Sequence, residues 1–199
     1  MLEFFLLYLR LNWVEITGAI ISFIYLFFSI REKSALWIFG FLSSILYIWV
    51  FFHHKLYAEI SLQIYYSIIS IYGWITWQRK TAATHEKQLH ITQISSYRHI
   101  LLYFVAAIGV YFIYYFVLKY LTDSPVPIAD SFVGSLSIIA TYMLAKKKIE
   151  NWLVWIVVDA FACGLYLYKG LYPTAILFVI YTTMAVVGFY QWKKKMQAQ

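Results

Sequence analysis

Seven long apolar stretches, separated by short polar segments, occupy most of this 199-residue chain. Each is 17 to 22 residues long. A helix that rises ~1.5 Å per residue needs about 20 residues to cross a hydrocarbon core of roughly 30 Å. In lipid the backbone has to satisfy its own hydrogen bonds, which favours helices. We therefore predict an all-α membrane protein with seven transmembrane helices. The stretches are Val14–Ile30, Ala35–Phe52, Ile60–Trp77, Ile100–Leu118, Ile128–Ala145, Asn151–Tyr168 and Leu171–Trp192.

The composition excludes most other classes of protein. The chain is 63% hydrophobic and 13% charged, whereas a soluble domain is about 45–50% apolar and about 25% charged. Its single cysteine, Cys163, has no intramolecular disulfide partner, and His85, His90 and His99 lack the i, i+4 spacing of a metal site. No phosphate-binding Gly-x-x-x-x-Gly-Lys-Ser/Thr pattern is present. We expect no cofactor, no metal and no enzyme activity.

The sixteen Lys and Arg residues are unevenly distributed over the predicted topology. With seven crossings, four fall on one face of the membrane, and twelve, including the runs 146–148 and 193–195, fall on the other. The positive-inside rule makes the second face cytoplasmic. The net charge of +7 therefore reports orientation rather than nucleic-acid binding. We predict a multi-pass protein with its N-terminus outside and its C-terminus in the cytoplasm.

A weak internal repeat indicates how the spans are organised. An offset of 115 residues aligns residues 15–80 with residues 130–195 without a gap. Three spans per repeat with one span between them give a 3+1+3 arrangement of parallel repeats, similar to SWEET sugar transporters. The predicted parts are 1–80, the first repeat; 81–127, a cytoplasmic connector plus a linking helix; and 128–199, the second repeat with a basic cytoplasmic tail. The coinciding landmarks include Ser22 with Ser137, Trp37 with Trp152, Tyr66 with Tyr181, Gly73 with Gly188 and Trp77 with Trp192.

The sixth stretch contains the residues that point most directly to a binding site. Trp152, Trp155 and Asp159 are spaced i, i+3 and i+7, which places them on one helical face. Asp159 is the one acidic residue well inside a predicted span, where a charge costs ~2.5 kcal/mol or more. Such residues mark ligand sites by default, although a protonated carboxyl group or a hydrogen bond between packed helices would also explain the residue. The aligned residue of the first repeat is Ser44, which predicts a carboxylate on one wall and a hydroxyl on the other.

The third stretch presents a polar and aromatic face. Gln63, Tyr66, Ser70 and Trp74 follow helical spacing, and isoleucines occupy the opposite face. In the seventh stretch, Tyr181 is placed to complete a cage. Aromatic cages bind flat or cationic heterocycles through stacking and cation–π attraction, worth up to ~2 kcal/mol when desolvated. We predict a small-molecule site near mid-membrane, between the repeats.

Tryptophan is also enriched at membrane interfaces. Trp77 and Trp192 lie near the predicted cytoplasmic ends of their spans, and we expect them to belong to such an interfacial belt. Trp74 and Trp155 lie one turn deeper in the membrane. For these two residues, ligand contact and ordinary packing are equally open.

Two segments, Gln63–Trp77 and Trp152–Asp159, resemble the PnuC family of bacterial vitamin transporters. The likeness covers nearly the whole chain, from about residue 13 to about residue 195. It implies uptake of nicotinamide riboside across the bacterial inner membrane by facilitated diffusion, without ATP hydrolysis or a coupling ion. Phosphorylation by a separate cytosolic kinase would then trap the substrate. The resemblance assigns ligand contacts to Gln63, Tyr66, Ser70, Trp152, Trp155 and Asp159.

The resemblance leaves the substrate open between two cations. The last motif position is Asn or Asp in this family, and here it is Asp159. A carboxylate suits the pyridinium of nicotinamide riboside and also the thiazolium of thiamine. An intramembrane enzyme would need a second catalytic group beside Asp159, which the sequence lacks, and a channel or receptor is a further alternative. We expect the lipid bilayer and a vitamin as partners, no nucleic acid, and leave a homo-oligomer open.

Overall fold

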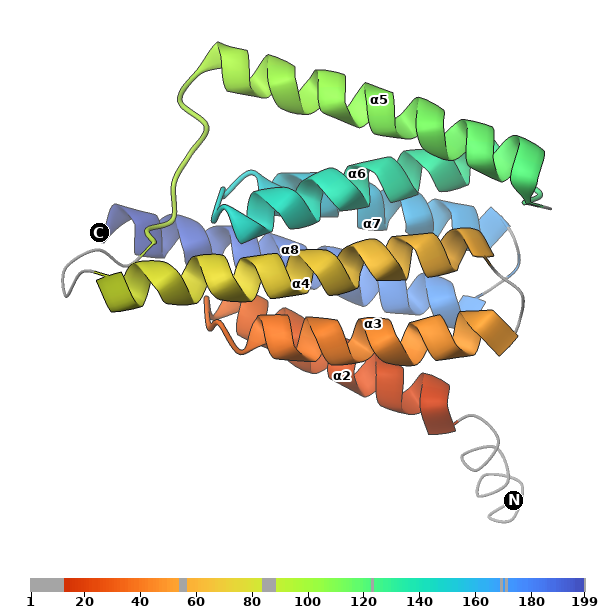
Figure 1. Cartoon of the computed structure of the whole chain (residues 1–199), viewed down its shortest axis with the longest axis horizontal. Coiled ribbons are helices and arrows are strands. Elements are labelled where there is room, and N and C mark those ends of the chain that lie inside the picture. Colours follow the sequence, from red (N-terminus) through yellow and green to blue (C-terminus); the bar gives the residue numbers. More distant parts are fainter. Residues whose placement is uncertain are drawn as a thin grey trace.

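The computed structural model describes residues 13–53, 57–83, 89–122, 124–168, 170 and 172–198. Within them the chain forms seven α-helices and no β-strand, apart from one isolated bridge between Thr92 and Lys148. This confirms the predicted all-α class. The predicted outer N-terminal segment, residues 1–12, and His85 lie outside the described residues. The helices are α2 (Trp13–Ile30), α3 (Leu36–His53), α4 (Tyr57–Ala83), α5 (Tyr97–Leu121), α6 (Pro127–Ala145), α7 (Asn151–Tyr168) and α8 (Tyr172–Gln197) (Figure 1).

Five of these helices are long and apolar enough to cross a membrane, judged by length and composition. They are α3, α5, α6, α7 and the Thr174–Gln197 part of α8. In α2, the apolar segment among the described residues is the shorter Ile20–Ile30. Helix α4 runs alongside the others, but it contains Gln63, Ser67 and Ser70, whose polar side chains lower its hydropathy (Figure 1). The least apolar long helix is therefore one of those predicted to contribute to a site.

The helices pack as two groups of three. Helices α2, α3 and α4 pack on one another in sequence order, and so do α6, α7 and α8. The groups meet where α4 packs on α6 and where α2 packs on α8, while α5 packs mainly on α6 at the outside of the bundle (Figure 1). The parallel 3+1+3 repeat and the boundaries at residues 80 and 127 stay predictions.

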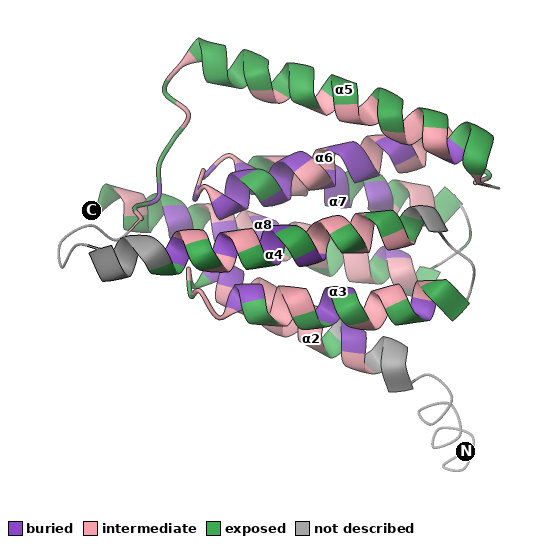
Figure 2. Ribbon diagram, in the orientation of Figure 1, coloured by how far each residue is buried: buried purple, intermediate pink, exposed green. Residues whose placement is uncertain are grey.

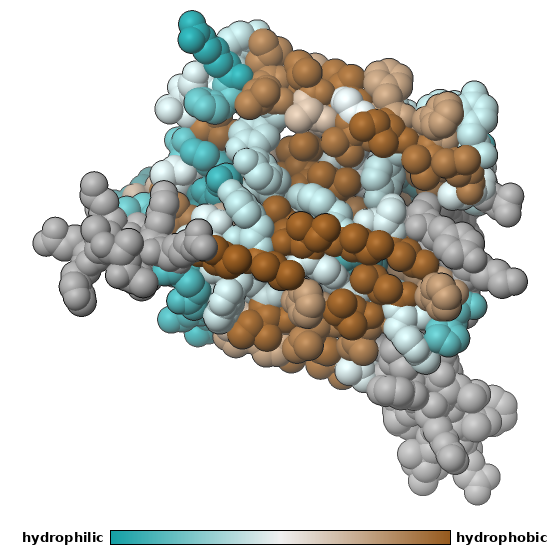
Figure 3. All heavy atoms as spheres, in the orientation of Figure 1, coloured by the Kyte–Doolittle hydropathy of each residue, from teal (hydrophilic) through white to brown (hydrophobic). Residues whose placement is uncertain are grey.

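Large apolar side chains cover the outside of the bundle. On α5, Leu102, Phe112 and Ile113 are exposed, and Leu118 is the one buried residue of the helix. Buried residues are concentrated on the helices of the two groups, whereas α5 is largely exposed (Figure 2). Apolar atoms dominate the middle of the visible face, and hydrophilic ones gather mainly toward its ends (Figure 3). Such an extended apolar surface fits contact with lipid.

Basic residues gather at one end of the bundle, which we call the basic end. It comprises the α2–α3 turn, the α6–α7 turn with Lys147, and the last turn of α8 with Lys195. Lys195 Nζ donates to the carbonyl oxygen of Arg31 (3.1 Å) and to Glu32 Oε2 (3.2 Å). Lys147 Nζ donates to Glu32 Oε1 (2.5 Å). The three segments therefore touch, and which side of the membrane they face stays a prediction.

Candidate substrate-binding site

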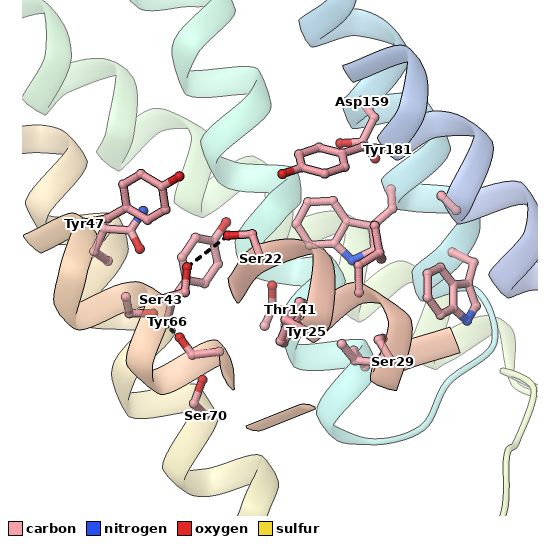
Figure 4. A pocket seen from close by; sticks show the side chains of 18 residues that line it. Ser22, Tyr25, Ser29, Ser43, Tyr47, Tyr66, Ser70, Thr141, Asp159 and Tyr181 are labelled. Carbon is pink, nitrogen blue, oxygen red and sulfur yellow. Dashed lines mark hydrogen bonds between the residues drawn. The ribbon is translucent and has the colours of Figure 1, made fainter. Parts of the chain in front are cut away.

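A cavity of about 250 Å³ lies between the two helix groups. Its lining comes from α2, α3, α4, α6, α7 and α8, so both groups contribute to it (Figure 4). Eight of the nine residues predicted from the sequence to contact a ligand line this cavity. Their role in substrate binding stays a prediction. The eight are Ser44, Gln63, Tyr66, Ser70, Trp152, Trp155, Asp159 and Tyr181.

Trp74 is the exception among the nine predicted residues. It packs against the apolar cluster that contains Trp77 and Trp192, and it does not line the cavity. Trp74 follows Ser70 by four residues, which places it one helical turn closer to the basic end. At that depth the cavity has ended, and packed tryptophans fill the space between the helices.

Asp159 is the one acidic residue in the lining, and no Lys or Arg lines the cavity among the described residues. Its side chain lies on α7 with 6% of the residue's surface exposed. Its carboxylate makes no hydrogen bond or ion pair within the described part of the chain, and it lies beside the ring of Tyr181 (Figure 4). Burying an unpaired carboxylate is costly. This position therefore favours a cation that comes from outside the chain.

The first helix group contributes a hydroxyl-rich wall on the other side of the cavity from Asp159 (Figure 4). Ser22 Oγ and Ser43 Oγ lie 3.0 Å apart and share a hydrogen bond between α2 and α3. Ser44 Oγ donates to the carbonyl oxygen of Gly40 (2.8 Å). A hydroxyl that donates one hydrogen bond keeps acceptor lone pairs for a ligand. The cavity is thus asymmetric, with an acidic side and an uncharged polar side.

The contribution of α2 to the lining was not predicted from the sequence. Ser22, Tyr25, Leu26 and Ser29 all line the cavity, and they follow the spacing i, i+3, i+4 and i+7 of one helical face. The spacing is visible in the sequence. Without a charged or amide side chain, however, such a face looks the same as one that packs against a neighbouring helix.

Helix α4 presents two distinct faces, as its sequence predicts. Ser67 and Ser70 are buried, whereas Ile64, Ile68 and Ile71 are exposed. The polar face therefore points into the bundle, and the isoleucine face points outward, where lipid would lie.

Trp77 and Trp192 do not form the interfacial belt predicted for them. Their exposed fractions are 5% and 0%, because each packs at the contact between the two helix groups. Trp77 Nε1 donates to the carbonyl oxygen of Ala145 on α6, at 3.1 Å. Trp192 Nε1 donates to that of Ser29 on α2, also at 3.1 Å. With two further buried tryptophans they close the cavity at the basic end as a tryptophan plug, which consists of Trp37, Trp77, Trp152 and Trp192.

The tryptophan plug has two matching halves. The rings of Trp37 and Trp77 meet edge to face, with centroids 5.5 Å apart and an interplanar angle of 88°. The rings of Trp152 and Trp192, each 115 residues further along the chain, meet at 5.6 Å and 84°. Equivalent contacts at the same sequence offset support the predicted repeat.

Two groups of apolar helices around a shared cavity, with one buried carboxylate inside it, define a membrane transporter for a small solute. The particular family follows from comparison with known proteins. The family model described as "Nicotinamide mononucleotide transporter" matches residues 12–194, so the chain belongs to that family. This confirms the family resemblance predicted from the sequence.

Relatives named for two different vitamins match most of the chain. The nicotinamide riboside transporter PnuC of Escherichia coli (strain K12) is 26% identical to this chain. The alignment is 205 positions long and covers 92% of this chain and 85% of the relative. The nicotinamide riboside transporter PnuC of Neisseria mucosa is 25% identical, in an alignment that covers 92% of this chain and 73% of the relative. The riboflavin/roseoflavin transporter RibM of Streptomyces davaonensis is 26% identical, with 90% and 84% covered.

The fold of this chain is also similar to that of a solved structure. The crystal structure of the vitamin B3 transporter PnuC matches with a TM-score of 0.74 and 25% sequence identity. The match covers 94% of this chain and 83% of that one. The similarity supports the assignment of the chain to the all-helical architecture of these transporters.

Proposed function

We propose that the protein takes up nicotinamide riboside across the bacterial cytoplasmic membrane by facilitated diffusion. The observation that carries this proposal is the buried, unpaired carboxylate of Asp159 in an aromatic cavity. Nicotinamide riboside contains a flat pyridinium cation. The carboxylate attracts the positive charge, and the rings of Trp155 and Tyr181 offer cation–π and stacking contacts.

The other half of the proposed substrate is a ribose with several hydroxyl groups. The uncharged polar side of the cavity, with Ser22, Ser43, Ser44 and Gln63, offers donors and acceptors for those hydroxyls. The ring at the acidic side and the sugar at the serine side would satisfy both halves at once. The asymmetry of the cavity therefore matches the asymmetry of the solute.

The size of the cavity favours a solute with one heterocyclic ring. Its volume of about 250 Å³ lies just below the range of roughly 300–1,000 Å³ that is usual for small-molecule pockets. The relative RibM is named for riboflavin, which has three fused and uncharged rings. A small cavity with an unpaired carboxylate fits a single cationic ring better.

Charge supports the proposed orientation of the protein and the proposed trapping step. The basic end would face the cytoplasm by the positive-inside rule, which places the N-terminus outside and the C-terminus inside. A cytosolic kinase that phosphorylates the ribose would add negative charge to the solute. The Asp159 carboxylate would repel that product, so the product could not leave through the same cavity.

Thiamine is the second candidate, because its thiazolium ring is also a cation that Asp159 would attract. Its aminopyrimidine replaces the ribose, so it would make less use of the serine side of the cavity. Binding of both compounds to the same protein separates the two candidates.

The test measures binding of nicotinamide riboside, its uncharged reduced form and thiamine to the purified protein by titration calorimetry. The pyridinium nitrogen has no N–H to donate, so the loss expected is that of a charge–charge attraction, roughly 1.5–4 kcal/mol at about 4 Å in a partly desolvated site, and Asp159→Asn should weaken nicotinamide riboside binding by about ten- to a thousandfold. The same substitution should leave binding of the reduced form unchanged, because that form has no cation. Equal losses for both forms would contradict the charge argument. If thiamine binds and nicotinamide riboside does not, thiamine is the substrate in place of nicotinamide riboside.

Facilitated diffusion is tested in proteoliposomes without ATP or an ion gradient. Radiolabelled nicotinamide riboside should equilibrate across the membrane without accumulating. Enclosing a kinase and ATP should turn equilibration into accumulation. Accumulation without the kinase, driven by an imposed proton or sodium gradient, would contradict the proposal.

A further inference from the structure

The basic end contains an ion-pair cluster that the substrate site does not explain. Glu32, in the α2–α3 turn, accepts hydrogen bonds from Lys147 in the α6–α7 turn and from Lys195 on α8. Lys147 and Glu32 are largely buried, with 9% and 11% of their side chains exposed, whereas Lys195 is 47% exposed. One carboxylate of the first helix group thus binds two ammonium groups of the second.

Lys147 lies between two partners from the opposite group. Its Nζ is 2.5 Å from Glu32 Oε1 and 4.5 Å from the centroid of the Trp77 ring. Trp77 in turn donates from Nε1 to the carbonyl oxygen of Ala145, two residues before Lys147. The α6–α7 turn is therefore held to the first group by an ion pair, a cation–π contact and a hydrogen bond, all within a few residues.

Glu32 and Lys147 occupy equivalent positions of the predicted repeat, because they are 115 residues apart. Both have a positive φ, 59° for Glu32 and 50° for Lys147, in the tight turns that join the first two helices of each group. The predicted parallel repeats would be related by a twofold axis along the membrane normal, and residues beside such an axis meet their own equivalents. The ion pair thus lies where the two groups approach each other at the basic end.

The same region closes the cavity. Ser29, Leu144 and Trp152 line the cavity at its basic end and are almost fully buried, and Trp152 packs in the tryptophan plug with Trp192. A solute that leaves toward the basic end has to separate the two groups there. Each contact between Lys147 and the first group has to break for that separation.

We propose that Glu32 and Lys147 form the releasable lock of a gate at the basic end, and that separating them opens the cavity to that side. The inference rests on transport, the activity of the family, and on no particular substrate. Ser29 and Trp152 belong to both the cavity lining and the plug region, so a solute in the cavity touches the gate itself. An ion pair suits a lock, because a charge that stays buried without a counter-charge favours the open state. Lys147 loses its counter-charge when Glu32 is removed, and Glu32 loses its own when Lys147 and Lys195 are both removed.

The experiment measures how fast a cysteine behind the gate reacts with a membrane-impermeant maleimide added from the side of the basic end. Cys163→Ser removes the one native cysteine, and Ala185→Cys introduces a reporter at a buried residue that lines the cavity next to the plug. In this background Glu32→Gln should raise the labelling rate at least tenfold. Glu32→Gln with Lys147→Met should return the rate toward that of the parent, because no buried charge is left unpaired.

Glu150→Gln is the matched control. Glu150 lies at the same end, but its Oε1 accepts from the backbone N–H of Ile94 at 2.7 Å rather than from the opposite helix group. This variant should label at the parent rate. An unchanged rate in Glu32→Gln would overturn the lock, and so would a double variant that labels as fast as the single one.

Lys147→Met with Lys195→Met approaches the same contact from the other side. Both lysines are replaced, because Lys195 alone would remain as a counter-charge for Glu32. This double variant should also label faster than the parent, and a parent-like rate in the folded protein would overturn the lock, so the proposal stays testable if Glu32→Gln does not fold. Labelling is measured without substrate. Labelling rates that contradict the lock would therefore say nothing about the proposed substrate. Failure of nicotinamide riboside to bind would likewise say nothing about the gate.

Discussion

Two glycines set how closely the tryptophan plug packs. A Cβ built on Gly188 would come within 2.7 Å of the Trp152 ring, where ordinary contact begins at 3.4 Å, and a Cβ on Gly73 would overlap the Trp37 ring still more. Both rings are 1% exposed, so neither has free space into which to retreat. Overpacking of a well-packed core costs about 1–3 kcal/mol, and we expect the upper part of that range for Gly73→Ala and Gly188→Ala.

The assay is thermal unfolding in detergent, followed by tryptophan fluorescence. A loss of about 2–3 kcal/mol corresponds to a midpoint lower by on the order of 5–10 °C for a chain of this size. Gly109→Ala on α5 and Gly164→Ala on α7 are the controls, because a Cβ at either position meets nothing within 4 Å. Ala is also the better helix former, so these controls should melt at or above the parent midpoint.

The two plug variants should differ in a second readout. Trp152 lines the cavity whereas Trp37 does not, so Gly188→Ala should also weaken substrate binding. Gly73→Ala should lower stability alone. Midpoints for both variants equal to that of Gly109→Ala would refute the close packing of glycine against tryptophan.

Further predictions concern α5 and the basic end. Leu118→Ala removes a buried side chain and should lower the unfolding free energy by about 2–5 kcal/mol, whereas Leu102→Ala, at an exposed position, should leave the midpoint unchanged. Burial lowers the pKa of Lys147 below its usual 10.5, despite the opposing effect of Glu32. The folded state therefore penalises the ammonium at neutral pH, and the penalty disappears as the pH rises toward 10.5. The midpoint of the parent should rise relative to that of Lys147→Met over that interval, and parallel curves for the two proteins would contradict the burial argument.

Apolar length and helical spacing are local properties, and they predicted the helices and eight of the eighteen residues that line the cavity. Asp159 could be singled out because a charge inside an apolar stretch has few explanations. Gln63, Tyr66 and Ser70 followed because they share one face of α4. In each case the signal lies within a single helix.

Contacts between helices were beyond the reach of this reasoning. A tryptophan near the end of an apolar stretch fits a membrane interface and a packed core equally well, and only the docking of the two groups buries Trp77 and Trp192. Trp74 was misplaced for the same reason, because spacing gives a side chain's direction but not the depth at which the cavity ends. Ser22 and Tyr25 have no charge that would distinguish their face of α2 from a packing face.

The pairing of Glu32 with Lys147 was not predicted, although the offset of 115 residues aligns the two residues and parallel repeats related by a twofold axis bring residues beside that axis together. An acidic residue that aligns with a basic one in a turn near the axis predicts an ion pair across it. Such a rule needs only the offset of 115 residues and the observation that both turns lie at the same end of the bundle.

The two halves match in the plug, whereas the cavity lining matches at Tyr66 and Tyr181 and differs at other aligned positions. Tryptophan aligns with tryptophan at both pairs of plug positions, whereas Ser44 aligns with Asp159 and Gly40 with Trp155. In the plug, each pair of tryptophan rings packs within its own helix group, and the tryptophan on the third helix of each group donates a hydrogen bond to the other group. A gate that closes between two equivalent groups therefore needs the same shape on both sides. A solute with a cationic ring at one end and a sugar at the other needs the opposite. A cavity with two equal walls would fit one end of such a solute and leave the other unsatisfied, which is a physical reason for the two walls to differ.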